Sequence, residues 1–177
     1  SAYKSQGRGG KGSSSTKLVD DDFINQIFIA STHAYVTFIT NEGRAYWIKI
    51  HEIPEATKNS RGSHIKGLLS LSPNEEITTV ATMEDFRDDS YLVMATANGT
   101  IKKIASSELQ NAKTRGVLAI RLKDGDKLVS AILTSGKDEL LLITRRGKAL
   151  RYSEEKVRVM GRSSSGLKGI KLATDRK

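Results

Sequence analysis

Short apolar runs, each closed by a turn that ends in glycine, recur along the chain and predict β-hairpins. In chain order, the paired runs lie over 35–40 and 44–50, 91–96 and 100–104, and 139–144 and 148–152. Their turns end at Gly43, Gly99 and Gly147, and glycine reaches the positive φ that tight turns need. The runs are rich in β-branched and aromatic residues, and no helix-period stripe exceeds two turns. The pattern therefore predicts an all-β chain.

Each hairpin continues through a polar connector to a second glycine and another apolar run. These glycines are Gly12, Gly62, Gly116 and Gly166, which are 50, 54 and 50 residues apart. The runs after the last three cover 65–71, 117–122 and 167–172 and are expected to be strands. A repeat of about fifty residues with about four strands per copy predicts antiparallel sheets stacked radially as propeller blades.

The repeat divides the chain into a partial first blade over 1–17 and successive blades over 18–177, about three blades plus parts. The array is therefore expected to be an incomplete ring, and its open strand edges invite pairing with other chains. The chain begins at Ser1 without an initiator Met and stops at Lys177 soon after an apolar run. We interpret it as a piece of a longer polypeptide.

Charge and composition limit the classes of function that the chain could have. The 177 residues include 29 Lys and Arg against 20 Asp and Glu, a formal charge of +9, which favours an anionic partner. The absence of cysteine excludes disulfides, thiolate nucleophiles and Cys-ligated zinc, and fits the reducing cytoplasm. No run approaches the roughly 20 apolar residues of a membrane span, so no membrane partner is expected.

Residues that could carry catalysis or bind a metal are sparse. His33, His51 and His64 have no carboxylate or cysteine at metal or triad spacing. The acidic run over 20–22 lacks the oxygen-ligand pattern of a calcium loop. We therefore predict no catalytic residue, metal or cofactor within this chain.

The basic residues follow the repeat. Those near the repeat glycines are Arg8, Lys11, Arg61, Lys66, Arg115, Arg121, Arg162 and Lys168, and those beside the hairpin turns include Lys102, Lys103, Arg145 and Arg146. Because equivalent positions in stacked blades share one radius and height, these side chains are expected to form a positive belt that suits a long, curved polyanion. Side chains alternate between the two faces of a strand, so at most one of Lys102 and Lys103 can join a given surface unless the strand ends there. The alternative is an ordinary solvated charged face.

The segment Gln6-Gly7-Arg8-Gly9-Gly10-Lys11-Gly12 is the most unusual local sequence. Its four glycines let the backbone approach a ligand closely, while Arg8 and Lys11 can donate to phosphate. Gly7, Gly9 and Gly12 formally match G-x-G-x-x-G, but no strand precedes them and no helix start follows, which excludes a dinucleotide site. A phosphate-binding loop and a basic terminal tail both remain open on composition.

This segment resembles the seven-residue gyrase box, Q-R-R-G-G-[RK]-G, of the C-terminal domain of the bacterial DNA gyrase A subunit. The similarity continues along the chain, over 53–57 with 61–62, 94–103, 124–126 with 133–136, and 157–162 with 166–170. One residue departs from the pattern. Gly7 stands where the family usually has Arg, which removes one of the three usual basic side chains of the box.

The resemblance implies a β-pinwheel, a propeller variant of normally six four-stranded blades in which neighbouring blades exchange strands. It also implies a cytoplasmic, nucleoid-associated domain that wraps double-stranded DNA with a positive sense, using Gln6, Gly9, Gly10 and Gly12 together with the basic residues above. The supercoiling reaction would need the rest of the A subunit, the B subunit, ATP and Mg²⁺.

Three other interpretations compete with this one. The corresponding domain of topoisomerase IV is similar, but typically lacks an intact box. A propeller-like scaffold that binds RNA or protein is the second. An enzyme in its own right is the third, and the absence of an acid, base and nucleophile cluster disfavours it.

Overall fold

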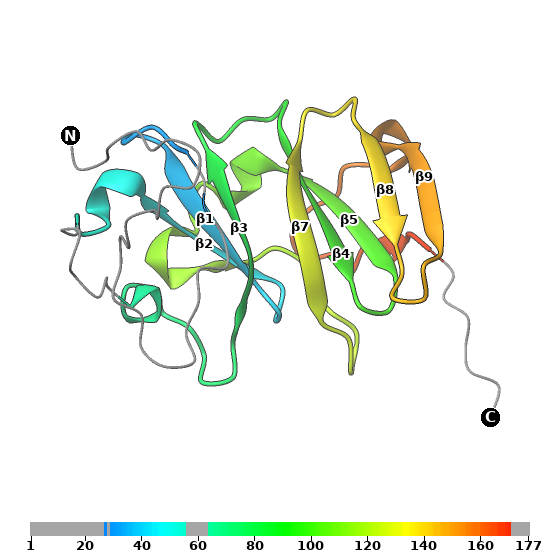
Figure 1. Cartoon of the computed structure of the whole chain (residues 1–177), viewed down its shortest axis with the longest axis horizontal. Helices are drawn as coiled ribbons and strands as arrows, with labels where there is room; N and C mark the ends of the chain where they lie inside the picture. Colours follow the sequence, from blue (N-terminus) through cyan, green and yellow to red (C-terminus); the bar gives the residue numbers. More distant parts are fainter. Residues whose placement is uncertain (1–26, 28, 56–63, 171–177) are drawn as a thin grey trace, which may run out of the picture.

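Ten short strands and five 3₁₀ turns make up the described part of a computed structural model, which covers residues 27, 29–55 and 64–170 (Figure 1). The strands are β1 (Tyr35–Thr40), β2 (Arg44–Lys49), β3 (Ile77–Met83), β4 (Tyr91–Thr96), β5 (Thr100–Ala105), β6 (Val117–Leu118), β7 (Leu128–Thr134), β8 (Glu139–Ile143), β9 (Ala149–Ser153) and β10 (Leu167–Lys168). The turns are η1 (Ile50–Glu52), η2 (Ile65–Gly67), η3 (Ser106–Leu109), η4 (Lys113–Arg115) and η5 (Glu154–Lys156). The described residues contain no α-helix, and the all-β prediction is confirmed.

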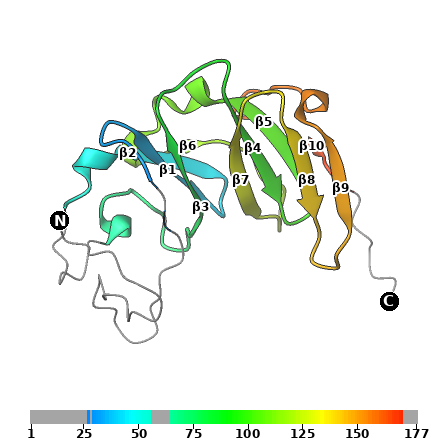
Figure 2. The ribbon, with the colours of Figure 1, turned by 45° about the horizontal axis from the view of Figure 1, so that its top comes forward.

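The strands form two four-stranded antiparallel sheets and one hairpin, arranged side by side (Figures 1 and 2). The strand orders are β3-β1-β2-β6, β10-β5-β4-β7 and β8-β9. Strand β6 follows β5 in the chain but pairs with β2 of the preceding sheet, and β10 likewise follows β9 but pairs with β5. Neighbouring blades thus exchange strands, as the resemblance to a β-pinwheel implied.

The three hairpin turns predicted at glycine share one geometry. Gly43, Gly99 and Gly147 have φ of 77°, 82° and 78°. Each glycine N–H donates to the carbonyl oxygen of a threonine three residues earlier, at 3.0, 3.0 and 2.9 Å. The threonine hydroxyl then accepts from the N–H that follows the glycine, at 3.3, 3.1 and 3.1 Å. The repeated Thr-x-x-Gly therefore closes each hairpin through both residues.

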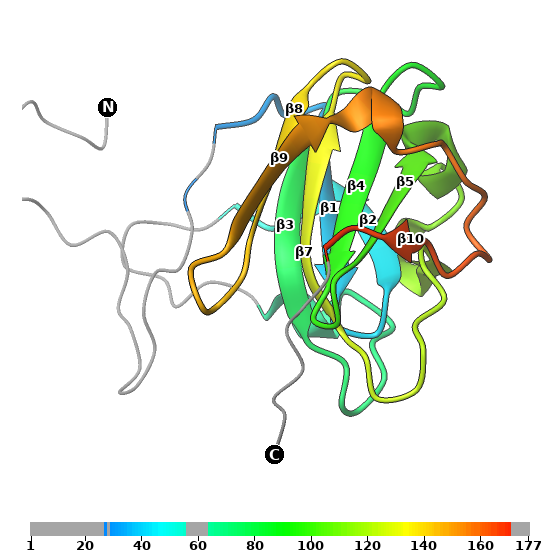
Figure 3. The ribbon, with the colours of Figure 1, turned by 90° about the vertical axis from the view of Figure 1, so that its right-hand side faces the viewer.

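The largest apolar cluster lies between the two four-stranded sheets, which stack face to face (Figure 3). Ile39 from the first sheet packs there with Leu92, Met94 and Leu128 from the second. Val93 points to the other face and joins a smaller cluster with Leu140 of the β8-β9 hairpin. Strand β4 is thus covered on both faces, as its consecutive apolar residues predict.

One predicted strand is wrong. The apolar run over 65–71 contains η2 and an irregular segment instead of a strand. The equivalent runs over 117–122 and 167–172 contain β6 and β10, which are strands because each pairs with the second strand of a preceding hairpin. The β1-β2 hairpin is the one described hairpin that precedes 65–71, and its second strand already pairs with β6.

Candidate nucleic-acid interface

The turn glycines Gly43 and Gly99 lie where a strand of a later blade joins the preceding sheet. The carbonyl oxygen of Gly43 accepts from the N–H groups of Ala119 and Ile120, at 2.8 and 3.1 Å. In the next blade, the carbonyl of Gly99 accepts in the same way from Gly169 and Ile170, at 2.9 and 3.2 Å. We call these two places the first and second exchange joints. The same pair of hydrogen bonds recurs at each joint because the sequence repeats.

Close packing explains why glycine begins each exchanged segment. Gly116 has φ of 71°, and a Cβ there would lie 2.3 Å from the Tyr46 ring. Gly166 has φ of 89°, and a Cβ there would lie 2.6 Å from the carbonyl oxygen of Ile101. A side chain is excluded at both positions by the preceding blade as well as by the backbone conformation.

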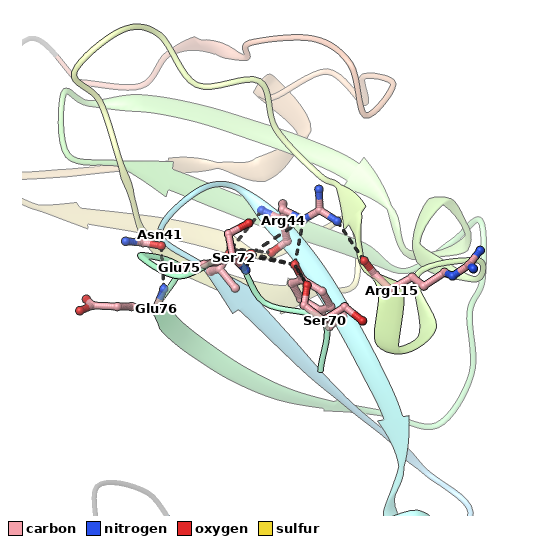
Figure 4. Close-up of polar contacts among 9 residues, drawn as sticks. Asn41, Arg44, Ser70, Ser72, Glu75, Glu76 and Arg115 are labelled. Atoms are coloured by element: carbon pink, nitrogen blue, oxygen red, sulfur yellow. Dashed lines mark hydrogen bonds and ion pairs between the residues drawn. The ribbon is translucent and has the colours of Figure 1, made fainter. Parts of the chain in front are cut away.

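At the first joint, a buried carboxylate holds the start of β2 in place (Figure 4). Glu75 is buried and accepts hydrogen bonds from the hydroxyls of Thr40, at 2.7 Å, and Tyr46, at 2.9 and 3.0 Å, and from the Ser72 N–H at 2.9 Å. Arg44 Nε donates to the Tyr46 hydroxyl at 2.8 Å. Burial raises the pKa of Tyr46, and Glu75 raises it further while the hydrogen bond from Arg44 opposes the shift.

This network places Arg44 against the segment that precedes Gly116. The other end of the guanidinium, Nη2, donates to the carbonyl oxygen of Arg115 at 2.9 Å (Figure 4). The segment Gln110-Asn111-Ala112-Lys113-Thr114-Arg115-Gly116, which we call the 110–116 turn, is anchored at further points. The Ser70 N–H donates to Thr114 O at 2.9 Å, and the Gly116 N–H donates to Ala112 O at 2.8 Å. Lys113, Thr114 and Arg115 are exposed on this anchored backbone.

Arg44 was not among the residues predicted from the sequence, although it follows a turn glycine. The available signal was its position, because Lys148 occupies the same place after Gly147. The Arg44 side chain has a structural role, since it supports both Tyr46 and Arg115. The side chain nevertheless remains 36% exposed, so it can also face an anion.

The prediction that Lys102 and Lys103 lie beside the turn as DNA contacts is wrong, because both lysines are buried. Lys102 Nζ donates to the carbonyl oxygens of Ala119 at 2.8 Å, Arg162 at 2.6 Å and Ser164 at 2.9 Å. Its ammonium therefore ties the segment of the first joint to the loop that precedes the second. Burial lowers the pKa of Lys102 to about 8, with Glu108 opposing this shift and Arg162 adding to it.

Lys103 is buried on the opposite face of β5. Its Nζ donates to the backbone carbonyl of Glu154 at 3.0 Å, lies 3.4 Å from the Glu154 carboxylate and stands 4.9 Å from the centre of the Tyr91 ring. The Glu154 carboxylate also accepts from the Thr134 hydroxyl, at 3.0 Å. Both lysines hold segments of the fold together, and we remove both from the candidate DNA contacts.

The other predicted cations have varied environments. Those that are exposed are Lys66, Arg115, Arg121, Arg145, Arg146 and Lys168. Arg162 is half-buried, and its Nε lies 3.1 Å from the Glu108 carboxylate. Arg121 lies beside it, because the Arg121 N–H donates to Ser164 O at 3.1 Å. Outside the described residues lie Gln6, Arg8, Gly9, Gly10, Lys11, Gly12 and Arg61.

Five cations lie at the two exchange joints. Arg44 and Arg115 mark the first joint, while Arg121, Arg162 and Lys168 mark the second. Among the described residues, no three histidine or acidic side chains are grouped so that they could hold a metal ion. Within the same residues, no helix has the length and apolar character needed to cross a membrane.

The sequence matches a known family along nearly its whole length. The family described as "DNA gyrase C-terminal domain, beta-propeller" matches residues 1–31, 34–82, 90–135 and 138–175. The chain belongs to this family. The DNA gyrase A protein of Treponema pallidum is 56% identical over 165 residues, which are 93% of this chain and 20% of that protein. The DNA gyrase A protein of Escherichia coli is 41% identical over 172 residues, 97% of this chain and 20% of that protein.

Solved structures agree with this membership in the gyrase C-terminal domain family. A structure of a DNA gyrase A C-terminal domain superposes with a TM-score of 0.75 and 34% identity, covering 98% of this chain and 55% of that one. A C-terminal domain of DNA topoisomerase IV superposes with a TM-score of 0.73 and 30% identity, covering 81% of this chain and 45% of that one. The predicted β-pinwheel is confirmed, and the matches to gyrase support that interpretation over topoisomerase IV. The chain spans about a fifth of the length of the curated relatives it matches.

Proposed function

We propose that this chain is the DNA-wrapping part of a gyrase A protein and bends duplex DNA along its exchange joints. The observation that carries the proposal is the recurrence of cations at equivalent joints of a gyrase-family β-pinwheel with a formal charge of +9. Side chains of Arg and Lys there would neutralise phosphates and release counterions, and successive blades would offer a curved path that repays the cost of bending.

In this proposal the chain supplies binding and curvature, and the chemistry belongs to the rest of the enzyme. Strand breakage would come from the remainder of the gyrase A protein, and ATP hydrolysis with Mg²⁺ from the gyrase B protein. The cytoplasmic nucleoid would be its site of action. The box residues Gln6, Gly9, Gly10 and Gly12, with Arg8, Lys11 and Arg61, remain proposed contacts.

Binding is expected to be strongly dependent on salt. With about six phosphates neutralised, log K should fall against log salt with a slope near −5. Fluorescence anisotropy of a labelled duplex, titrated with the whole 177-residue chain between about 50 and 200 mM salt, measures this slope. An affinity that barely changes over that range contradicts electrostatic wrapping. Single-stranded RNA that competes as well as duplex DNA would favour the RNA-binding scaffold instead.

Wrapping is separated from simple binding by DNA topology. Relaxed circular DNA is incubated with the chain and a nicking-closing enzyme, and the protein is then removed. Positive writhe held by the protein should remain as positive supercoils in the purified circles. Circles that stay relaxed, although the chain binds them, would reduce the proposal to binding without wrapping.

Glu108 is expected to restrain DNA binding at the second joint, because its carboxylate competes with phosphate for Arg162. Glu108→Gln removes this competitor and should raise duplex affinity about two- to five-fold, the range expected for loss of one surface ion pair. Glu155→Gln is the matched control, since Glu155 is exposed and the same charge is removed away from the joints. Equal affinity gains in the two variants would show only a change in net charge.

A further inference from the structure

The 110–116 turn holds a lysine in a backbone conformation that lysine avoids. Lys113 has φ of 44°, and it is the one non-glycine residue with positive φ among the described residues. In this left-handed region Cβ approaches the following carbonyl oxygen, so residues with a side chain are disfavoured. Such an outlier is maintained only where the surroundings determine it, and it points to function.

The surroundings do determine this conformation. Leu109 O accepts from the Ala112 N–H at 2.9 Å, and the carbonyls of Ala112, Thr114 and Arg115 are each held by a hydrogen bond, as described above. The backbone on both sides of Lys113 is thus held by hydrogen bonds within the turn and to the first blade. A lysine on such a turn is presented from a rigid frame, which reduces the ordering cost of binding.

The sequence repeat gives the turn a counterpart. When the chain is aligned on Gly116 and Gly12, the 110–116 turn matches the Gln6 to Gly12 segment at its first residue, Gln, and at its last two, a basic residue followed by Gly. Lys113 falls at the position of Gly9. A left-handed backbone is natural for glycine, so the 110–116 turn keeps a backbone suited to glycine and adds a positive charge to it.

The charges around Lys113 are also suited to an anion. Arg115 is two residues away and exposed, and the guanidinium of Arg44 contacts the Arg115 carbonyl (Figure 4). Neither Lys113 nor Arg115 takes part in an ion pair within the described part of the chain. Two exposed cations therefore lie on one anchored turn, and the partly exposed Arg44 contacts that turn from β2.

We propose that the 110–116 turn is a further phosphate-binding element, in which Lys113 and Arg115, supported by Arg44, hold the backbone of duplex DNA two repeats along the sequence from the Gln6 to Gly12 segment. The strained backbone at Lys113 is kept because it presents the ammonium group at this joint. This proposal rests on the proposed DNA-wrapping function and names a contact within it.

The test compares Lys113→Gly, Lys113→Ala and Lys113→Arg in the whole chain. Gly and Ala both remove the charge, but only Gly relieves the backbone. Each should weaken duplex binding about three- to ten-fold and flatten the salt slope by about 1, while Arg restores both. Lys156→Ala is the matched control, because Lys156 is an exposed lysine in another 3₁₀ turn, η5. Its loss of affinity should be under about two-fold.

The urea midpoint of unfolding distinguishes a DNA-binding Lys113 from one with a merely structural role. The urea midpoint of Lys113→Gly should equal or exceed that of the wild type, and should exceed that of Lys113→Ala, although both variants bind DNA more weakly. Affinity of Lys113→Gly equal to that of the Lys156→Ala control overturns this proposal alone. A midpoint for Lys113→Gly below that of Lys113→Ala overturns the assignment of strain. A wild-type chain that does not bind duplex DNA overturns the proposed function and this contact with it.

Discussion

Replacing Gly116 with alanine is expected to destabilise the chain by about 3 to 5 kcal/mol. Gly116 has φ of 71° and ψ of 158°, a region that is essentially limited to glycine and costs other residues about 1 to 3 kcal/mol. The new methyl group would also lie 2.3 Å from the Tyr46 ring. The ring cannot easily move, because it is fully buried and its hydroxyl is held by Glu75 and Arg44. Overpacking of this kind adds about 1 to 3 kcal/mol.

Gly125→Ala is the matched control for this variant. Gly125 has nearly the same φ, 73°, but no atom lies within 4 Å of its added Cβ. It should cost only about 1 kcal/mol, the cost of the left-handed backbone alone. Urea denaturation can be followed by the emission of Trp47, the sole tryptophan, whose indole N–H donates to Leu109 O at 3.0 Å between the first two blades. Equal losses in the two variants would show that the contact with Tyr46 does not matter.

The hairpins could be predicted because their determinants are local. The Thr-x-x-Gly sequence contains both the positive-φ residue and the hydroxyl that caps the turn, so each hairpin is encoded within a few residues. The repeat of glycines was equally visible, and at Gly116 and Gly166 the structure explains it by contact with the preceding blade. The exchange of strands was implied only by the family resemblance. It depends on β2 pairing with β6, which lies far along the chain, and no local pattern encodes that partner.

The missed features depend on partners that are distant in the sequence. Strands β3 and β7 escape the repeat pattern because threonine and serine interrupt their apolar runs. Lys102 and Lys103 look like surface residues until their acceptors are known, and those acceptors lie 17 to 62 residues away. One signal was available. Aligned on the turn glycines, Lys102 falls at the position of Tyr46 and Leu150, so a lysine occupies an otherwise apolar position of the hairpin.

The sequence predicts the candidate site only in outline, as cations in phase with the repeat. A basic residue beside a turn can serve either DNA or the fold, and the sequence does not distinguish the two roles. Burial separates them here, since Lys102 and Lys103 are enclosed while Arg115 and Arg121 are exposed. Strain at Lys113 was equally hidden, because backbone dihedral angles cannot be read from the sequence of an exposed polar turn.

Lys102→Met is expected to destabilise the chain by about 3 kcal/mol or more. Methionine retains much of the buried stem, but removes the ammonium that donates to three carbonyls at the joints. Each buried carbonyl that loses its donor costs about 1 to 3 kcal/mol. The substitution also removes the cost of burying a charge, which offsets only part of the loss from the three carbonyls. Lys123→Met, at an exposed lysine, should change the unfolding free energy by no more than about 0.5 kcal/mol. Similar effects of the two substitutions would contradict the structural role of Lys102.

The pH dependence of this effect has a definite sign. The pKa of Lys102 is lowered to about 8 in the folded chain from an ordinary value of 10.5, so between these pH values the unfolded chain binds more protons than the folded one. The unfolding free energy contributed by Lys102 must therefore rise with pH across that window, and stay flat below it. Urea denaturation of the wild type and Lys102→Met at about pH 7, 8.5 and 10 gives this contribution as a difference, in which the titration of other groups cancels. A difference that shrinks with pH would mean that the three carbonyls stabilise the ammonium more than burial disfavours it.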